Sequence, residues 1–580
     1  MTIDPDISPW EAWLRKWFCW LLAPAILVNA GGLFVAILEP DGALYATIAK
    51  TISQTGDFIN LRVDGRDWLD KPHFPFWMAA WSFRIFGISG FAYKLPALLC
   101  WGAGAWYTYR LAHAIYNRPV ARLATLIYVS AAHLVISNND VRAEPYLTGL
   151  IIGSVYHFYR ASRSGPFWHL LAGSLLAACA VMTKGPFVGI TIGGGLLTDW
   201  IMTRDWQQFR SGRWWIALAL TGLFILPELY CLWQQFDLHP EKQVFGRTGV
   251  SGIRFFFWDS QFGRFFNTGP IKGSGDPFFY LHTLLWAFLP WSLLLYAAII
   301  RRFRSWKKDR ILPGTALCAG ASILTFIVFS LSRFQLPHYL NILFPFFSIL
   351  TAAWITGLSR QKSRKIAGMV QNGIALLLPA LLLFLCWILH FRHWLFTLVA
   401  VAVLSAAIFV IFRGSDLPGA FARSFCAALL AFAFVNFYLY PALLEYQAGT
   451  VAGKYVNRLP EVYNRGIPAA AQDVLPAGEG LHPQVVYMLR DAPVNYSFEF
   501  YCRIPVRRVS TDSLGSVMKG GETLFFLPSD SLSGLSGNGY KVQRLKEFPD
   551  FHVSQLTGQF LYYRTRQNVL NWYSLARVFK

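Results

Sequence analysis

The sequence has few charged residues for its length, and acidic residues are the rarer kind. Only 14% of the 580 residues are charged, whereas about a quarter is usual in soluble domains, and 55% are hydrophobic. This composition excludes an ordinary soluble protein. It predicts an integral membrane protein, with the lipid bilayer as its surroundings.

The chain also lacks a cysteine framework and a compact metal-binding spacing. Seven of the eight cysteines lie in or beside apolar segments, and Cys502 lies alone in a polar tail, so neither a disulfide scaffold nor a zinc finger is predicted. No His-x-x-x-His pair is present, which leaves the use of a metal ion undecided. The first apolar segment is too long for a removable signal peptide and is expected to remain as an anchor.

Long apolar segments fill the first three quarters of the chain. A membrane-spanning helix needs about 20 mostly apolar residues, and thirteen segments, some of them shorter, are predicted to span the bilayer. They are residues 18–38, 93–111, 120–136, 145–159, 167–182, 187–201, 214–233, 280–300, 314–331, 339–358, 370–388, 394–412 and 425–439.

Basic residues gather in alternate loops between these segments. Short cytoplasmic loops collect Lys and Arg, and the basic set here is residues 15–16, 110–122, 160–163, 204–213, 301–310, 360–365 and 413–423. This pattern predicts a cytoplasmic N-terminus and an extracytoplasmic C-terminus. The net charge of +21 arises mainly from these loops, so no nucleic-acid partner is predicted.

Two parts of the chain are predicted from these patterns. The first is a membrane domain, residues 1–445, with an outer loop at 234–279 and two outer juxtamembrane helices within 39–92. Leu44, Ile48 and Ile52 recur at helical spacing in one of these helices, and residues 74–86 form the other.

The second part is an extracytoplasmic mixed α/β domain, residues 446–580. Its predicted strands are residues 485–489, 496–503, 523–527, 541–545 and 559–563, and its predicted helices are residues 451–459 and 570–578. No catalytic motif is visible in it.

Acidic residues occur at the ends of the apolar segments on the predicted outer side. Asp41 follows Glu39 and Pro40, and a carboxylate placed there can accept a proton or bind a metal. Asp140 and Glu144 flank Arg142, whose planar side chain suits a phosphate. The structural alternative is that these residues only cap helices and pair with one another.

Isolated basic residues occur on the same predicted side. Lys71 lies two residues before His73, Lys184 ends an apolar segment, and Arg333 precedes His338 and Tyr339. Several cations that converge from distant loops favour an anionic ligand such as a phosphate. Taken singly, each could instead extend to the lipid headgroups.

Five short segments of the sequence resemble those of a known family. The segments that carry the resemblance are Glu39 to Ala46, Asp70-Lys71-Pro72, Arg142-Ala143-Glu144-Pro145, Thr183-Lys184-Gly185-Pro186 and Leu336-Pro337-His338-Tyr339. In this order they are similar to the polyprenyl-phosphate-sugar glycosyltransferases of the GT-C superfamily. Within it they most resemble the branch with aminoarabinose lipid A transferase and the protein O-mannosyltransferases.

The resemblance implies a GT-C membrane fold and a role for each matching residue. Asp41 and Glu144 would be the catalytic acidic residues, while Lys71, Lys184, Arg333 and Arg142 would bind the donor phosphate. Glu39, Asp140, Tyr45, His73, His338 and Tyr339 are further site candidates. The family often has an Asp-Glu pair followed by Arg-Tyr, where this chain has Asp41-Gly42 and Leu44-Tyr45.

The implied reaction moves a sugar, aminoarabinose among the candidates, from a polyprenyl monophosphate such as undecaprenyl phosphate to an outer-leaflet acceptor, with inversion. Lipid A, a protein hydroxyl and a glycan are the acceptors considered, and some relatives use a divalent metal. Two other classes are weighed against this one. A lipid or sugar transporter would have repeated halves and a site at the bilayer midplane, and an envelope assembly protein would have these charged loops by coincidence.

Overall fold

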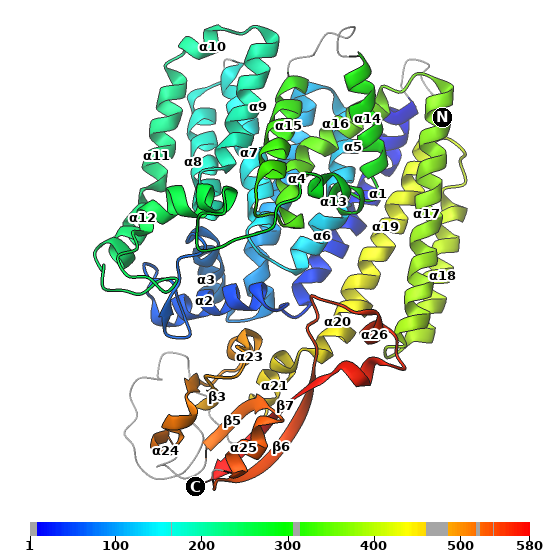
Figure 1. Ribbon diagram of the computed structural model, residues 1–580. Helices are drawn as coiled ribbons and strands as arrows, with labels where there is room; N and C mark the ends of the chain where they lie inside the picture. Colours follow the sequence, from blue (N-terminus) through cyan, green and yellow to red (C-terminus); the bar gives the residue numbers. More distant parts are fainter. Residues whose placement is uncertain are drawn as a thin grey trace.

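A bundle of long helices forms most of the molecule, and a five-stranded sheet with short helices lies at one end of it (Figure 1). The computed structural model describes residues 9–163, 165–305, 314–459, 485–517, 523–537 and 539–579. We call residues 447–579, where described, the tail segment, and the end of the bundle that it faces the tail end. Part of the basic 301–310 loop lies outside the described residues.

The bundle is built from helices of very different lengths. Its elements are α1 (Pro9–Gly31), η1 (Gly32–Phe34), α4 (Gly90–Ile115), α5 (Arg118–Val129), α6 (Ala132–Asn139), α7 (Glu144–Ser162), α8 (Phe167–Lys184), α9 (Val188–Thr203), α10 (Gln207–Arg210), α11 (Arg213–Leu232), α13 (Phe279–Ala287), α14 (Ser292–Ser305), α15 (Thr315–Leu331), η4 (Pro337–Leu343), α16 (Phe344–Thr356), α17 (Gln361–Leu389), α18 (Trp394–Ile411), α19 (Leu417–Phe434), η5 (Val435–Leu439), α20 (Tyr440–Leu443) and η6 (Leu444–Tyr446).

Every predicted apolar segment coincides with a helix or with two consecutive helices. Among the described residues, seven helices are long and apolar enough to cross a membrane, or eight if the bent pair α5 and α6 counts as one span. The chain is therefore a multi-pass membrane protein, while the number thirteen stays a prediction. Many large side chains on the bundle surface, such as Trp20, Trp215 and Phe396, are exposed, as lipid-facing side chains would be.

A break between α5 and α6 leads the chain into the acidic loop. The two helices meet at an angle of 50°, and the side chains of Asn138 and Asn139 donate hydrogen bonds to Asn29 (2.8 Å) and Asn436 (2.9 Å). These amide pairs fix the end of α6 between α1 and η5, because unpaired amides are costly to bury. Asp140 to Ala143 follow, and α7 begins at Glu144.

Helices α4 and α7 touch through their backbones. A Cβ atom at Gly149 would overlap the carbonyl oxygen of Cys100 and lie 2.9 Å from its carbonyl carbon. Gly104 on α4 faces the same spot, since a Cβ there would lie 3.4 Å from the Cα of Gly149. The absence of side chains at these positions allows α7 to lie directly against α4.

The connection from α1 to α4 covers the tail end of the bundle with two short helices (Figure 1). It contains α2 (Asp41–Thr55), the antiparallel hairpin β1 (Arg62–Val63) and β2 (Arg66–Asp67), and α3 (Phe74–Phe86). Leu44, Ile48 and Ile52 pack in one cluster with Phe76 and Ala80. Both helices lie where the sequence pattern placed them, because the apolar stripe of α2 is buried against α3.

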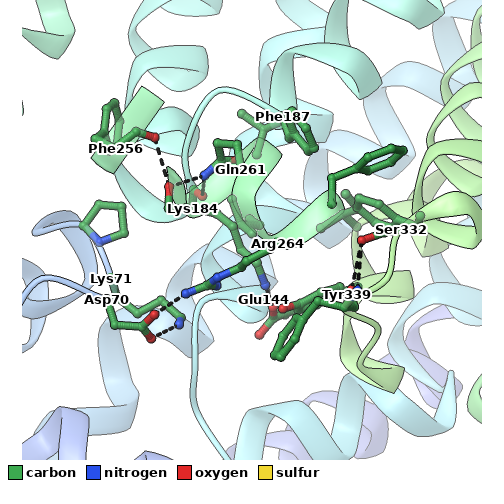
Figure 2. A pocket seen from close by; sticks show the side chains of 18 of the residues that line it. Asp70, Lys71, Glu144, Lys184, Phe187, Phe256, Gln261, Arg264, Ser332 and Tyr339 are labelled. Atoms are coloured by element: carbon green, nitrogen blue, oxygen red, sulfur yellow. Dashed lines mark hydrogen bonds and ion pairs between the residues drawn. The ribbon is translucent and has the colours of Figure 1, made fainter. Parts of the chain in front are cut away.

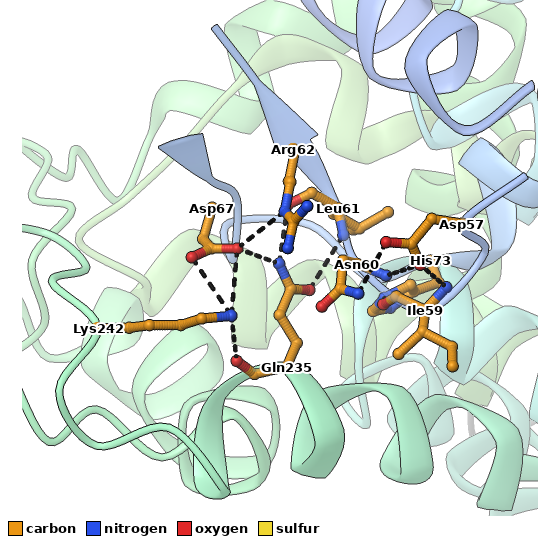
Figure 3. A network of polar contacts seen from close by, with 9 residues as sticks. All are labelled: Asp57, Ile59, Asn60, Leu61, Arg62, Asp67, His73, Gln235 and Lys242. Carbon is orange, nitrogen blue, oxygen red and sulfur yellow. Dashed lines mark hydrogen bonds and ion pairs between the residues drawn. The ribbon is translucent and has the colours of Figure 1, made fainter. Parts of the chain in front are cut away.

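A polar network fastens this connection to the end of α11 (Figure 3). The buried side chain of Gln235, in η2 (Trp233–Asp237), accepts from the backbone nitrogen of Leu61 (3.0 Å) and donates to the Leu61 oxygen (2.9 Å) and Asp67 (3.0 Å). Lys242 lies 3.5 Å from Asp67 and donates to the Gln235 carbonyl. The connection from α11 to α13, which also contains α12 (Gly252–Arg254) and η3 (Phe255–Gly263), is thereby tied to the hairpin.

The tail segment folds around a mixed sheet with the strand order β4-β3-β5-β7-β6. Strand β3 is parallel to β4 and β5, while β7 is antiparallel to β5 and β6. Its elements are α21 (Ala448–Val456), β3 (Val486–Leu489), α23 (Tyr496–Tyr501), β4 (Val506–Val509), η7 (Thr511–Ser513), α24 (Leu514–Val517), β5 (Thr523–Pro528), α25 (Ser531–Gly537), β6 (Lys541–Asp550), α26 (Gly558–Leu561), η9 (Arg566–Val569) and β7 (Asn571–Phe579).

Three of the predicted tail elements are wrong. Residues 496–501 form helix α23, whose first turn is capped by the side chain of Asn495, and residues 558–561 form the short helix α26. The predicted helix at 570–578 is strand β7, which lies between β5 and β6 with a nearly continuous buried run. Short apolar runs do not distinguish a buried strand from a buried helix. The predicted boundary at residue 446 stays a prediction.

Candidate active site

A cavity opens between the α1–α4 connection, the α11–α13 connection and the ends of several helices. It holds about 1010 Å³ of empty space, counting the part open to solvent. Its apolar lining includes Leu147, Phe187, Leu232, Phe256 and Phe329, and its polar lining includes Asp70, Lys71, Glu144, Lys184, Glu228, Gln261, Arg264 and Tyr339 (Figure 2). Such a lining suits a ligand with a charged head and a hydrocarbon chain.

On one wall of this cavity, Asp70 pairs with two cations. Its carboxylate contacts the ammonium of Lys71 and the guanidinium of Arg264, and each of the three side chains is at most 20% exposed (Figure 2). Burial raises the pKa of Asp70, but the two cations lower it more, so the pKa lies below its ordinary value. Burial lowers the pKa of Lys71 despite the partner carboxylate. One carboxylate therefore neutralises only part of the positive charge on this wall.

A second charged cluster lies at the start of α7. Glu144, 1% exposed, pairs with Lys184 at the end of α8, and its Oε1 lies 3.8 Å from Nε2 of His338. The Lys184 ammonium lies 3.8 Å from the centre of the Tyr339 ring. Glu144 Oε2 has no hydrogen-bond partner among the described residues. This arrangement leaves a buried acceptor in the cavity lining next to a fixed cation.

Asp41 belongs to a third cluster. Arg142 lies 2.7 Å from Asp41 and 2.9 Å from Asp140, so it joins the first residue of α2 to the loop before α7. Burial raises the pKa of Asp140, although Arg142 opposes this effect. The Asp41 side chain keeps an exposure of 39%. Arg142 is therefore paired with carboxylates and is less available to a phosphate than the sequence suggested.

A smaller cavity links the clusters. Tyr45, Lys71, Arg142 and Tyr146 line it, and Lys71 lines the larger cavity as well. Tyr45 packs edge-on against Phe76. Lys71 thus lies between the two cavities. Lys184 and Arg264 line the larger one, and Arg142, which pairs with Asp41, lines the smaller one.

Six of the site candidates line neither cavity: Asp41, Asp140, His338, His73, Glu39 and Arg333. The last three make contacts away from the charged clusters described above. The backbone and ring of His73 donate to Glu228, each at 3.0 Å, and the other ring nitrogen lies 2.9 Å from the Ile59 carbonyl. Glu39 Oε1 accepts from the backbone nitrogen of Ser497 at 2.8 Å, and burial raises the pKa of Glu39 to about 7. The Arg333 side chain is exposed, and the Arg333 backbone nitrogen donates to the Phe265 carbonyl oxygen at 3.1 Å.

The described residues do not fit a metal ion. No group of three His, Cys, Asp or Glu side chains among them is placed to hold one. Asp41 and Asp140 pair with Arg142, Glu144 with Lys184, and Glu39 and His73 contact distant parts of the chain. The carboxylates that the sequence offered as ligands are thus turned toward protein partners.

Arg264 is the cation that the sequence reasoning missed. It lies just after η3, in a stretch rich in aromatic residues from Phe255 to Phe266, and it lines the larger cavity together with Lys71 and Lys184. The same signal that marked Lys71, a lone cation within an apolar stretch, is present there. The irregular backbone of the connection gave no helix end with which to associate it.

Comparison with known proteins agrees with this architecture. The family model described as dolichyl-phosphate-mannose-protein mannosyltransferase matches residues 70–230. The crystal structure of ArnT from Cupriavidus metallidurans bound to undecaprenyl phosphate superimposes with a TM-score of 0.70 and 17% identity, over 97% of this chain and 98% of that one. The chain has the GT-C glycosyltransferase fold. The predicted resemblance to polyprenyl-phosphate-sugar glycosyltransferases and the predicted fold class are confirmed.

Curated relatives are about a quarter identical to this chain over the residues that match. An uncharacterized protein of Aquifex aeolicus is 25% identical over 75% of this chain and 79% of its own. The undecaprenyl phosphate-alpha-4-amino-4-deoxy-L-arabinose arabinosyl transferase of Pseudomonas paraeruginosa is 27% identical over 62% of this chain. The match spans 65% of that enzyme, and 51% of the corresponding enzyme 1 of Pseudomonas fluorescens.

Proposed function

We propose that this protein transfers a sugar from a polyprenyl monophosphate to an acceptor at the outer leaflet of a bacterial inner membrane. The observation that carries the proposal is the convergence of Lys71, Lys184 and Arg264 on one cavity with a largely apolar lining. The apolar lining suits the isoprenoid chain, and the cations suit its phosphate. The resemblance to ArnT and to the protein mannosyltransferases supports the same donor class.

The three cations would act on the bond that breaks. As the bond between the sugar and the phosphate opens, negative charge grows on the leaving phosphate. Fixed cations placed there stabilise the transition state more than the ground state. Asp70 now contacts both Lys71 and Arg264, so the phosphate would share these cations with Asp70. Glu144 holds Lys184 in place beside Tyr339.

Asp41 would act on the acceptor. It is partly exposed and is oriented by Arg142, which lines the smaller cavity beside Lys71. The sugar would occupy this smaller cavity, between the phosphate cations and the carboxylate. Asp41 could then remove the proton of an acceptor hydroxyl as it attacks the anomeric carbon from the side opposite the phosphate, which inverts that carbon.

The relatives indicate which sugar and which acceptor to test first. The aminoarabinose transferase of Pseudomonas paraeruginosa matches over 62% of this chain, so aminoarabinose and lipid A are the first pair to test. The family model that matches residues 70–230 is named for mannose and protein, which makes a mannosyl donor and a protein hydroxyl the second pair. In both cases the loops with Asp41, Lys71 and Arg264 would face the outside, as the basic loops at the opposite end indicate.

The test uses purified protein reconstituted in proteoliposomes with radiolabelled polyprenyl-phosphate sugars. We expect labelled acceptor and free polyprenyl phosphate to appear together, and only when an acceptor is present. A matched variant, Arg264→Met, should lose most of this activity, whereas Arg333→Met should retain it because the Arg333 side chain is exposed outside the cavity. Movement of the intact donor across the membrane without release of polyprenyl phosphate would show a transporter and contradict the proposal.

A further inference from the structure

Helix α23 of the tail segment is held at both ends by residues next to Asp41. Glu39 accepts a hydrogen bond from the backbone nitrogen of Ser497 at 2.8 Å. At the other end, the Lys50 ammonium donates to the carbonyl oxygens of Glu499 (2.7 Å) and Cys502 (2.8 Å). Glu39 lies two residues before Asp41, and Lys50 lies on α2, which Asp41 begins.

Tail residues also hold the backbone that leads into Asp41. The Tyr501 hydroxyl accepts from the Ile37 nitrogen at 2.9 Å. The Gln447 side chain accepts from the Glu39 nitrogen at 3.1 Å and donates to the Ile37 oxygen at 3.0 Å. These contacts satisfy the backbone nitrogen and oxygen of Ile37 and the backbone nitrogen of Glu39, in a stretch that belongs to no helix or strand. The path of the chain into Asp41 therefore depends on two side chains more than four hundred residues away.

The same stretch is fixed to the bundle at one earlier point. Lys94, buried on α4, donates to the carbonyl oxygens of Gly32 (3.1 Å) and Val35 (2.9 Å). Lys94 also contacts the Ala36 carbonyl oxygen at 3.4 Å. From Ile37 to Glu39, the described side chains that bond to the backbone come from the tail segment. Glu39 and Lys50 line neither cavity, and their charged groups are engaged by Ser497 and by the carbonyls of Glu499 and Cys502.

We propose that the tail segment is a positioning element of the active site, in which α23 sets the place of Asp41 relative to Arg142 through Glu39, Lys50 and Tyr501. This inference rests on the proposed function, because it assigns the tail a role in the same reaction. Of the donor-phosphate cations, Lys184 and Arg264 lie on other segments. Lys71 lies on the same connection as Asp41, but its ion pair is with Asp70, which also contacts Arg264, and we expect these ion pairs to persist without α23.

The expected cost follows from geometry. A displacement of about 1 Å of a catalytic group can cost about a hundredfold in rate. Loss of the Lys50 ammonium would leave the carbonyls of Glu499, Phe500 and Cys502 without this donor, and unpaired buried acceptors weaken a contact. Without the α23 contact, α2 would keep its apolar packing on α3. Its first turn, which begins at Asp41, would no longer be held in one position.

The experiment compares Lys50→Met with Lys50→Arg and with the control Lys541→Met, which removes an exposed lysine at the start of β6. We expect Lys50→Met to lower kcat by about 10- to 100-fold with the donor KM nearly unchanged, because the phosphate cations stay in place. Lys50→Arg should recover much of the rate, since it keeps a cationic donor. Lys541→Met should match the parent protein.

A second pair tests the other end of α23. Glu39→Ala removes the acceptor for the Ser497 nitrogen and should lower kcat, whereas Glu39→Gln keeps an oxygen there and should not. Equal kcat in Glu39→Ala, Lys50→Met and the parent protein would overturn the inference. A rise in donor KM with kcat intact would also overturn it, because the tail would then act on donor binding.

Hydrogen exchange separates this inference from the proposed function. In Lys50→Met, amides of residues 37–45 should exchange faster than in the parent, and those of α8 should not. If the parent protein transfers no sugar, the proposed function fails, and the exchange result still decides whether α23 holds the loop. Unchanged exchange at residues 37–45 would show that the tail does not position Asp41, whatever the activity.

Discussion

Single side chains decide what this cavity can do, and the most informative is Lys71. It lines both cavities and pairs with Asp70. Its position between the phosphate cations and the Asp41 pair makes it the residue most sensitive to changes on either side. The charge of a lysine, unlike that of an arginine, also depends on pH in the range where proteins are stable.

The first prediction concerns the pH dependence that Lys71 imposes. Because burial lowers its pKa, Lys71 loses its charge at a lower pH than an ordinary lysine does, and donor binding should weaken as the pH rises through that value. Lys71→Arg keeps its charge at any accessible pH, so its activity should begin to decline at a higher pH than that of the parent protein. Its activity at neutral pH should be lower, because the guanidinium differs in shape from the ammonium. Measurement of kcat/KM for the donor from pH 6 to 10 tests this. The same alkaline decline in both proteins would exclude Lys71 as its cause.

Asp41 gives the second prediction, which distinguishes two classes of acceptor. Asp41→Asn removes a base but keeps the side-chain size. Transfer to a hydroxyl acceptor should fall by about 10²- to 10⁴-fold, whereas transfer to a phosphate, which is already ionised, should remain measurable. Parallel assays with lipid A and with a sugar alcohol test this. If neither rate changes, Asp41 is not part of the site.

Lone charges beside apolar helix ends could be recognised from the sequence, and three of them meet at one place in the structure. Lys71, Glu144 and Lys184 line the larger cavity. His73 and Glu39 look similar in the sequence, but their partners Glu228 and Ser497 are distant along the chain. Because such partners depend on the fold, the sequence could not show that these two residues are already engaged.

Secondary-structure elements act here mainly through how they are joined. The α1–α4 connection carries Asp41 and Lys71. It contains only two short helices and a hairpin with two residues in each strand. Its position comes from Gln235 and Lys242 beside α11 and from α23 of the tail segment (Figure 3). Small elements of this kind take their order from tertiary contacts.

Gln235 therefore provides a prediction about stability. Gln235→Ala would remove three hydrogen bonds and leave the Leu61 backbone nitrogen without this acceptor in a buried place, which typically costs about 1–3 kcal/mol. The Leu61 oxygen would keep its bond from the Trp68 nitrogen. The thermal unfolding temperature in detergent should fall, and donor affinity should fall with it because Lys71 lies on the same connection. Gln207→Ala on the short helix α10, whose side chain has no such role, is the control. An unfolding temperature equal to that of the parent would show that the network is dispensable.

Elements with strong periodicity were predictable, and short ones were not. The apolar stripe of α2 and the aromatic run of α3 marked both helices correctly. In the tail, β7 was mistaken for a helix because its burial is nearly continuous and hides the alternation of a strand. Helix α23 was mistaken for a strand because its aromatic residues favour strands, while its cap and its contacts with α2 decide otherwise.

At the scale of the whole molecule, the charges divide the bundle into two ends. The clusters with Asp41, Lys71 and Glu144 are associated with the connections at or near the tail end, and the basic loop that contains Arg204 and Arg210 lies at the other (Figure 1). The positive end should face the cytoplasm. This orientation puts the site where polyprenyl-linked sugars meet outer-leaflet acceptors.

Thiol labelling tests this orientation. A membrane-impermeant maleimide should label Ser533→Cys on α25 in intact spheroplasts, whereas Ser211→Cys beside α10 should react only after the membrane is permeabilised. The parent chain, with its own cysteines, gives the background. Labelling of Ser211→Cys first would invert the topology and move the proposed site to the cytoplasm.

The contact between α4 and α7 has a consequence for anyone who engineers this protein. At Gly149 a single added methyl group would push the two backbones apart, and α7 starts with Glu144, five positions earlier. The usual gain from replacing a helical glycine by alanine should therefore be reversed here. Mutational scans should find that Gly149 does not tolerate substitution. The damage should appear first at Glu144, which pairs with Lys184, rather than in the anchoring of the chain to the bilayer.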